Sequence, residues 1–239
     1  MTNLLEQVLE IHGGLTQFSS YNKVYVKMKV GGALWALKGH PYIISNSEFE
    51  IDLRKQSGGY LNFNNESGTY TNFSHDRVSI ENNGKLVEEL INPRDRFAGH
   101  SLETPWSVLQ LIYFGSYAMW SYLTTPFLFT YPGFICKEIE PWHEAGETWR
   151  RLHVTYPEQM AYHSKEQVFY FDKHGFLKRL DYDVDIMGGS TAAHYAFDYK
   201  EFQGIMVPTR RHVYPRDSNG KYMSDPLVVD IELLEVKFR

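Results

Sequence analysis

The sequence contains a single cysteine, Cys136, among its 239 residues. One cysteine cannot form a disulfide within the chain, so the chain is typical of a reducing compartment. Basic residues are also few, since 24 Lys and Arg stand against 29 Asp and Glu and give a net charge of −5. Nucleic-acid binding needs a dense stripe of Lys and Arg. We therefore expect no nucleic-acid partner.

The N-terminal segment lacks the basic start and the apolar run of a secretory signal peptide, which predicts a cytoplasmic protein. No linker, low-complexity tract or internal repeat interrupts the chain. A chain of this length buries roughly 70% of its extended surface on folding, enough for a core without staples. We predict one domain over residues 1–239, with its oligomeric state left open.

Motifs for metals and nucleotides are missing as well. There is no His-x-His, His-Glu-x-x-His or Cys-x-x-Cys, and no Gly-x-x-x-x-Gly-Lys or Gly-x-Gly-x-x-Gly. Ten histidines are present, so a metal site built from distant residues stays open. We predict no metal and no cofactor.

Aromatic residues are abundant, with 17 Tyr, 15 Phe and 5 Trp. Such residues suit either ordinary sheet packing or the wall of a pocket. Most of the chain shows period-two alternation, as in Val24, Val26, Met28 and Val30, with turn signals such as Asn82-Asn83-Gly84 between segments. About a dozen strands without a βαβ rhythm predict one antiparallel sheet, which must curl.

Two segments have helical spacing instead. At the N-terminus, Thr2 can cap a helix whose stripe is Leu4, Leu5, Val8, Leu9 and Ile11. Gly13 and Gly14 can end it after His12, whose positive imidazole the helix dipole would favour.

The second helical segment lies between Glu103 and Lys137, where no residue is charged. Thr104-Pro105 is typical of a helix start, Gly115-Ser116 indicates a break, and Pro126 closes the segment. The predicted insert spans about 104–128. Polar interruptions and the lack of a basic flank disfavour a membrane span, and we consider membrane-surface contact unfavoured too. An all-round apolar helix must be buried, so we predict a helical hairpin packed against the sheet.

This order of N-terminal helix, meander, central helices and meander resembles the open β-barrel of LolA-like lipoprotein carriers and the related VioE-type enzyme of violacein biosynthesis. Short strings, including Phe97-Ala98-Gly99-His100 and Pro208-Thr209-Arg210-Arg211, resemble an uncharacterised bacterial family. The resemblance implies an apolar cavity closed by helices. The predicted fold is therefore mainly β (α+β), a strongly curved antiparallel sheet or half-barrel with an N-terminal helix and a central helical plug.

Polar candidates come from one loop and three strands. Arg96 and His100 precede the apolar insert, where they either sit at a cavity rim or belong to a solvated cluster. His194 alternates with Tyr195, and neighbouring strands carry Asp181 and Arg210. If the polar faces align, Asp, His and Arg meet on one side. Alternation alone leaves open whether that side is the convex exterior or the concave cavity.

We predict a cofactor-free isomerase or cyclase that acts on a hydrophobic, aromatic small molecule inside the barrel. His100 and His194 would be the acid–base groups, and Arg96 and Arg210 the anion anchors. Aromatic walls would complete the substrate site, formed by Trp106, Tyr113, Tyr117, Trp120 and Tyr195. The alternative is a carrier or sensor that binds a hydrophobic ligand such as a lipid without transforming it.

Overall fold

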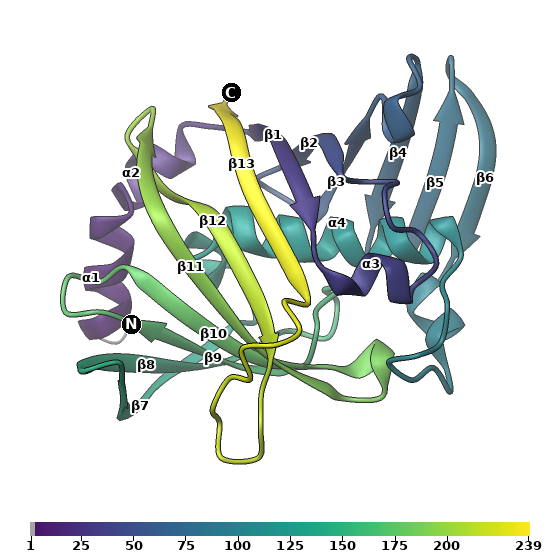
Figure 1. Ribbon diagram of the computed structural model, residues 1–239. Helices are drawn as coiled ribbons and strands as arrows, with labels where there is room; N and C mark the ends of the chain where they lie inside the picture. Colours follow the sequence, from purple (N-terminus) through teal and green to yellow (C-terminus); the bar gives the residue numbers. More distant parts are fainter. Residues whose placement is uncertain (1–2) are drawn as a thin grey trace.

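The structure is a computed structural model that describes residues 3–239. The expected cap Thr2 lies outside the described residues. Thirteen strands form one antiparallel sheet, accompanied by four α-helices in this part of the chain (Figure 1). The predicted fold class is confirmed: a curved antiparallel sheet with an N-terminal helix and a central helical plug.

The sheet grows outward from its middle. Its first six strands are β1 (Lys23–Gly31), β2 (Asn46–Asp52), β3 (Ser57–Leu61), β4 (Thr69–Ser74), β5 (Arg77–Asn82) and β6 (Lys85–Ile91). The other seven are β7 (Ile135–Glu144), β8 (Glu147–Thr155), β9 (Glu166–Phe171), β10 (Leu177–Val184), β11 (Ser190–Phe202), β12 (Ile205–Pro215) and β13 (Val229–Phe238). Strands β1 and β13 pair with each other, so β6 and β7 form the two outer edges.

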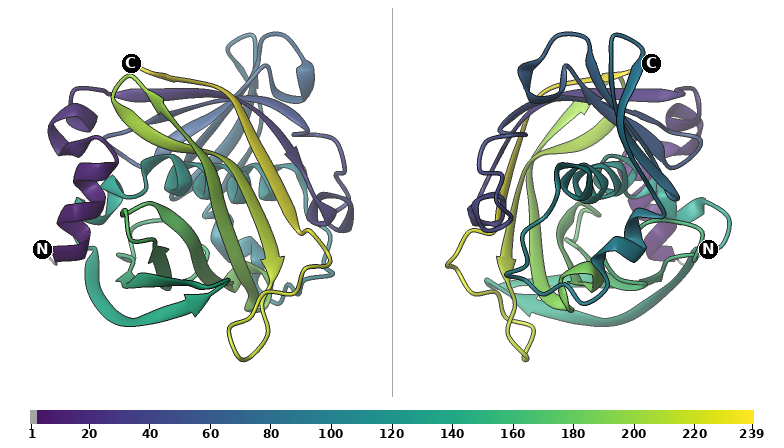
Figure 2. Two further views of the ribbon diagram at one scale, coloured as in Figure 1. Left: turned by 60° about the vertical axis from the view of Figure 1, so that its left-hand side comes forward. Right: turned by 90° about the vertical axis from the view of Figure 1, so that its right-hand side faces the viewer.

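The helix α4 (Val108–Thr124) is part of the connection between those two edges. It does not pass outside the sheet. Both views in Figure 2 show it inside the curve, and the right-hand view looks along its axis with strands on several sides. Sixteen of its residues are buried. This placement explains why the segment carries no charge: every face of the helix meets protein.

The bounds of α4 differ from the prediction. Ser107, rather than Thr104, caps it, because its hydroxyl accepts from the Gln110 N–H at 3.2 Å and Gln110 Oε1 accepts from the Ser107 N–H at 2.8 Å. The predicted break at Gly115 and Ser116 is wrong, and so is the hairpin, because a single helix runs through both residues. It ends at Thr124, ahead of Pro126 as predicted.

The N-terminal helix α1 (Asn3–Ile11) buries the predicted leucine and valine stripe. Beyond it, α2 (Gly14–Ser19) and α3 (Ala33–Leu37) are short. The charge predicted for His12 is wrong. Its ring is buried between Phe176 and Tyr199, and burial lowers its pKa to about 4, so it is neutral at pH 7. No helix within residues 3–239 combines the length and apolar character that a membrane crossing needs.

Candidate ligand-binding interior

Strand register decides which predicted residues face the interior. His194 of β11 pairs with Leu180 of β10 and Val213 of β12, whereas Tyr195 pairs with Arg179 and His212. Directly paired residues of antiparallel strands share a face of the sheet. His194 therefore faces the concave side, and the expected alignment of Asp, His and Arg on one face does not occur.

Two predicted binding residues, Tyr195 and Arg210, lie on the convex face instead. The Tyr195 hydroxyl donates to Glu144, and Arg210 pairs across the sheet with Phe197 and lies 3.9 Å from Asp230. Neither side chain reaches the interior, where the prediction placed it. The alternative that the polar strand faces lie on the convex exterior is correct for Tyr195 and Arg210. It is wrong for His194.

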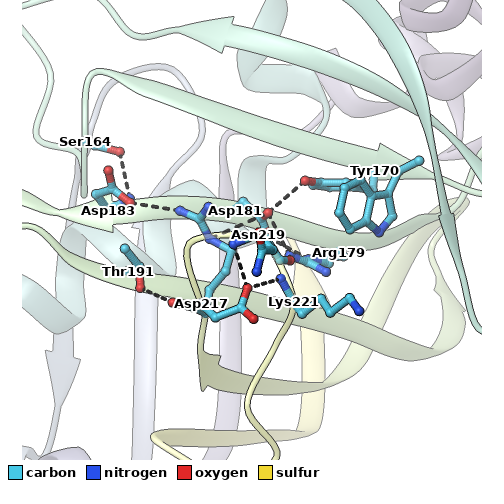
Figure 3. Close-up of polar contacts among 12 residues, drawn as sticks. Ser164, Tyr170, Arg179, Asp181, Asp183, Thr191, Asp217, Asn219 and Lys221 are labelled. Atoms are coloured by element: carbon cyan, nitrogen blue, oxygen red, sulfur yellow. Dashed lines mark hydrogen bonds and ion pairs between the residues drawn. The ribbon is translucent and has the colours of Figure 1, made fainter.

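The convex face holds a dense charge cluster around Arg179 (Figure 3). Arg179 is fully buried, with Nε 2.6 Å from Asp181 Oδ1 and Nη1 2.6 Å from Glu144 Oε2. The Tyr170 hydroxyl donates to Asp181 at 2.7 Å, and the carbonyl oxygen of Gly220 accepts from Arg179. Burial works against the charged guanidinium, but the Asp181 carboxylate outweighs it and the pKa of Arg179 is raised. This cluster fastens the loop after β12 to the sheet.

The loop before α4 also departs from the prediction. Arg96 is exposed, and only its carbonyl oxygen contacts the helix, accepting from Gln110 Nε2 at 2.8 Å. Arg94 is the inward arginine, with Nη2 2.7 Å from Asp185 Oδ2. His100 packs edge-on against the Phe97 ring. Within the described residues, no contact joins His100 to His194.

The interior holds a continuous chain of neutral polar side chains. The Tyr117 hydroxyl lies 3.2 Å from His163 Nδ1, and the Tyr122 hydroxyl lies 2.8 Å from His163 Nε2. Tyr122 and Tyr182 hydroxyls are 3.1 Å apart, and Tyr182 continues to His194 Nδ1 at 3.4 Å. The chain thus links α4, the loop before β9, β10 and β11.

Arg211 on β12 sets the direction of this chain. Its Nη1 lies 3.3 Å from His194 Nε2, and a guanidinium has donors only, so that nitrogen must accept. The remaining proton of the neutral His194 ring then sits on Nδ1 and points to Tyr182. Tyr182 in turn donates to Tyr122, and Tyr122 to His163. Each hydrogen bond is oriented away from the cation.

Arg211 also closes the C-terminal end of α4. Its Nη2 donates to the carbonyl oxygen of Tyr122 at 3.1 Å. That carbonyl lacks its usual helical donor because the fourth residue onward is Pro126, which has no N–H. The side chain is only 3% exposed, and burial lowers the pKa of its guanidinium from the ordinary value.

The tyrosines and histidines of this hydrogen-bonded chain are all neutral near pH 7. Burial lowers the pKa of His163 to about 3, with a smaller contribution from Arg94. Burial and Arg211 hold the pKa of His194 well below its usual value, and burial raises that of Tyr122 to about 12. The tyrosine–histidine chain can therefore bind a ligand by hydrogen bonds. Arg211 is the cation in contact with this chain.

Two small apolar cavities adjoin the chain. One of about 30 Å³ is lined by Met28, Tyr60, Met119 and Tyr122 among others, and one of about 70 Å³ by Leu34, Leu102 and Ala192 among others. Phe114, Tyr182 and Val229 line both. A polar, open recess of about 750 Å³ lies elsewhere, over β2, β3 and β4.

The predicted aromatic wall is mostly packing. Trp106, Tyr113, Tyr117 and Trp120 line neither small cavity. Trp106 packs on Phe114, and Trp120 Nε1 donates to the Asp52 carbonyl oxygen at 2.9 Å. The plug fills most of the hollow that the sequence predicted. Sequence reasoning missed Phe114 and Tyr182. The alternation of β10 marks Tyr182 as an inward position, whereas α4 is buried on every face and gives no such signal for Phe114.

This architecture is an open, plugged half-barrel, and it matches known structures. A LolA superfamily protein from Nitrosomonas europaea aligns with a TM-score of 0.54 at 11% identity, over 99% of this chain and 92% of that one. A domain from Vibrio parahaemolyticus, described provisionally as an outer membrane lipoprotein-sorting protein, aligns with a TM-score of 0.49 at 11% identity, over 98% and 93%. The chain has a LolA-like fold.

No protein-family model matches the sequence, and no curated protein sequence does. In the part of the chain that the structure describes, no three His, Cys, Asp or Glu side chains gather as a metal site would require.

Proposed function

We propose that this protein binds a hydrophobic small molecule between α4 and the concave face of the sheet, as a carrier or sensor. The observation that carries the proposal is the position of Phe114. Its ring lines both apolar cavities, which meet at Phe114, Tyr182 and Val229, so a ligand that displaces these side chains would reach from one cavity into the other. Ligand sites are mostly apolar, with a few polar groups that fix orientation, and the tyrosine–histidine chain supplies those groups.

Entry of a ligand requires movement of α4, because the present cavities are smaller than a lipid chain. The topology permits such movement. Strands β6 and β7 are the unpaired edges of the sheet, and α4 lies in the connection between them. The helix can shift without breaking hydrogen bonds between strands. The bonds that such a shift would strain are those of α4 side chains. Gln110 bonds the Arg96 carbonyl, Trp120 bonds the Asp52 carbonyl, Tyr117 and Tyr122 bond His163, and Arg211 bonds the Tyr122 carbonyl.

The fold supports the same proposal. A LolA-like fold agrees with the resemblance to lipoprotein carriers that the order of sequence elements indicated. The isomerase or cyclase stays a prediction with less support, because His100 and His194 occupy separate surroundings and His194 is fully buried. Acid–base catalysis needs both groups within reach of one substrate.

Binding of N-phenyl-1-naphthylamine, a neutral probe that fluoresces in apolar sites, tests the proposal. Ala118 lines the 30 Å³ cavity, so Ala118→Leu fills it, and Ala98→Leu on an exposed loop is the matched control. We expect the wild type and Ala98→Leu to bind the probe equally, and Ala118→Leu to bind it about tenfold more weakly. Equal binding by all three proteins, or none by the wild type, would contradict the proposal.

A further inference from the structure

The protein contains two buried arginines with opposite surroundings. Arg179 contacts the carboxylates of Asp181 and Glu144. Arg211 is buried to a similar degree, yet within residues 3–239 no carboxylate lies within 4 Å of its guanidinium. A buried charge is strongly unfavourable unless it is paired. The charge of Arg211 is therefore without a counterion.

Other groups offset the Arg211 charge only in part. The C-terminal end of α4 contributes about half a negative charge through carbonyls such as that of Tyr122. The face of the Tyr122 ring lies 5.0 Å from the guanidinium carbon and adds a weaker attraction. His194, the remaining partner, is neutral. These contacts hold the Arg211 side chain in place, but they offset only part of its positive charge. One anion would neutralise the rest.

Two tyrosines connect the unpaired cation with the 30 Å³ cavity. Tyr122 and Tyr182 belong to the polar chain that starts at Arg211, and both also line the 30 Å³ cavity. The inward residue opposite Arg211 on β11 is Ala196, whose small side chain adds little bulk on that side of Arg211. Arg211 itself lines neither cavity, so an acid group that reaches it from the 30 Å³ cavity must pass the Tyr122 and Tyr182 hydroxyls.

We propose that Arg211 binds the carboxylate of an amphipathic ligand, a single acid group on a hydrocarbon tail, with the tail lying in the cavities on either side of Phe114. This inference rests on the proposed function and specifies its ligand class. A planar carboxylate matches the fork of a guanidinium. It also brings one negative charge to one unpaired positive charge. A phosphate dianion would leave its second charge without a cation, because Arg94 is already paired with Asp185.

The test compares two probes with the same tail, palmitate and hexadecanol, by isothermal titration calorimetry on the full chain. Arg211→Met removes the charge at similar length, and Arg211→Lys keeps the charge. Arg210→Met is the control, since it removes the neighbouring arginine from the convex face. We expect the wild type and Arg210→Met to prefer palmitate by about tenfold or more. We expect Arg211→Met to bind both probes alike, and Arg211→Lys to retain part of the preference.

Each contrary result has a distinct meaning. If the wild type binds the two probes equally, the acid site is wrong and the hydrophobic site stands. If Arg211→Met keeps the preference for palmitate, the assignment to Arg211 is wrong. If the wild type binds neither probe, the proposed function fails together with this inference.

A second measurement on the wild type is independent of whether Arg211→Met folds. NMR of palmitate labelled with ¹³C at the carboxyl carbon follows its ionisation in the bound state. We expect the bound acid to have a lower pKa than the same acid free in solution, because Arg211 favours the ionised form. A raised pKa would place the carboxyl group in apolar surroundings and overturn the inference.

Discussion

The hydroxyl of Tyr60 on β3 occupies the space beside the backbone of Gly115 in α4. A Cβ atom on residue 115 would lie 2.4 Å from the Tyr60 hydroxyl oxygen and 3.5 Å from Cζ. The glycine therefore allows the helix to approach the concave face of the sheet. It is a packing requirement rather than a helix break, which explains why its sequence signal misled.

Gly115→Ala should destabilise the protein despite the better helix propensity of alanine. Propensity favours Ala by about 1 kcal/mol, but the clash with Tyr60 forces a shift that costs about 1–3 kcal/mol more than this gain. Urea denaturation measures the change in unfolding free energy. Tyr60→Phe removes the offending oxygen, so the double variant should recover most of the loss. A double variant as unstable as Gly115→Ala would show that another contact is responsible.

The sheet and its plug could be predicted from sequence because their signals are local. Alternation in segments such as Val24 to Val30 marks strands, and the missing charges around α4 mark a buried helix. The order of elements then predicts the curved, open sheet. None of these signals requires knowledge of which strands pair.

The interior could not be predicted, because it depends on register. Alternation places His194 and Tyr195 on opposite faces but does not say which face is concave. The pairing of β10, β11 and β12 determines which residues face the concave side. Arg211 faces that side, whereas the predicted Arg210 lies on the convex face. The extent of the hollow is equally non-local, since it depends on how closely α4 approaches β3 at Gly115.

Arg179→Met should destabilise the fold strongly, because it removes the cation of Glu144 and leaves Asp181 only the longer contact with Arg216, at 3.7 Å. Breaking a buried ion pair from one side costs about 3–5 kcal/mol. Arg210→Met, at a half-exposed site on the same face, should change the unfolding free energy by no more than about 0.5 kcal/mol. Urea titrations of both variants give the comparison. Similar small losses in both would mean that the Arg179 cluster does not hold the sheet.

Phe114→Ala should reduce stability and improve ligand binding at once. Removal of a buried phenyl ring costs about 3–5 kcal/mol, and here it also enlarges the two cavities that the ring lines. Phe18→Ala is the matched control, because Phe18 is buried against Phe127 and lines neither cavity. Thermal unfolding with and without hexadecanol measures both effects.

The two variants should separate only when hexadecanol is present. Both should unfold at lower temperature than the wild type. The alcohol should raise the unfolding temperature of Phe114→Ala by more than that of Phe18→Ala, since binding to the folded state stabilises it by mass action. An equal response would place the ligand outside the two cavities that Phe114 lines.

The buried histidines should make the protein unstable in mild acid. His12 has a pKa of about 4 and His163 of about 3 when folded, against about 6.5 in the unfolded chain. Between these values the unfolded state binds more protons, so the unfolding free energy falls as pH decreases from about 6.5 toward 4. Each histidine contributes up to about 1.4 kcal/mol per pH unit in that window.

His12→Gln isolates one of these contributions. The ring Nδ1 of His12 lies 2.8 Å from the Val8 carbonyl oxygen, and a glutamine amide supplies a donor that does not titrate. The wild type should be the more stable protein at pH 7. Its advantage should shrink by up to about 1.4 kcal/mol per unit as the pH falls below 6.5, as measured by urea denaturation at pH 7, 6, 5 and 4.5. A constant difference across that range would mean that the folded state admits a charged His12, so the burial between Phe176 and Tyr199 would not control its protonation.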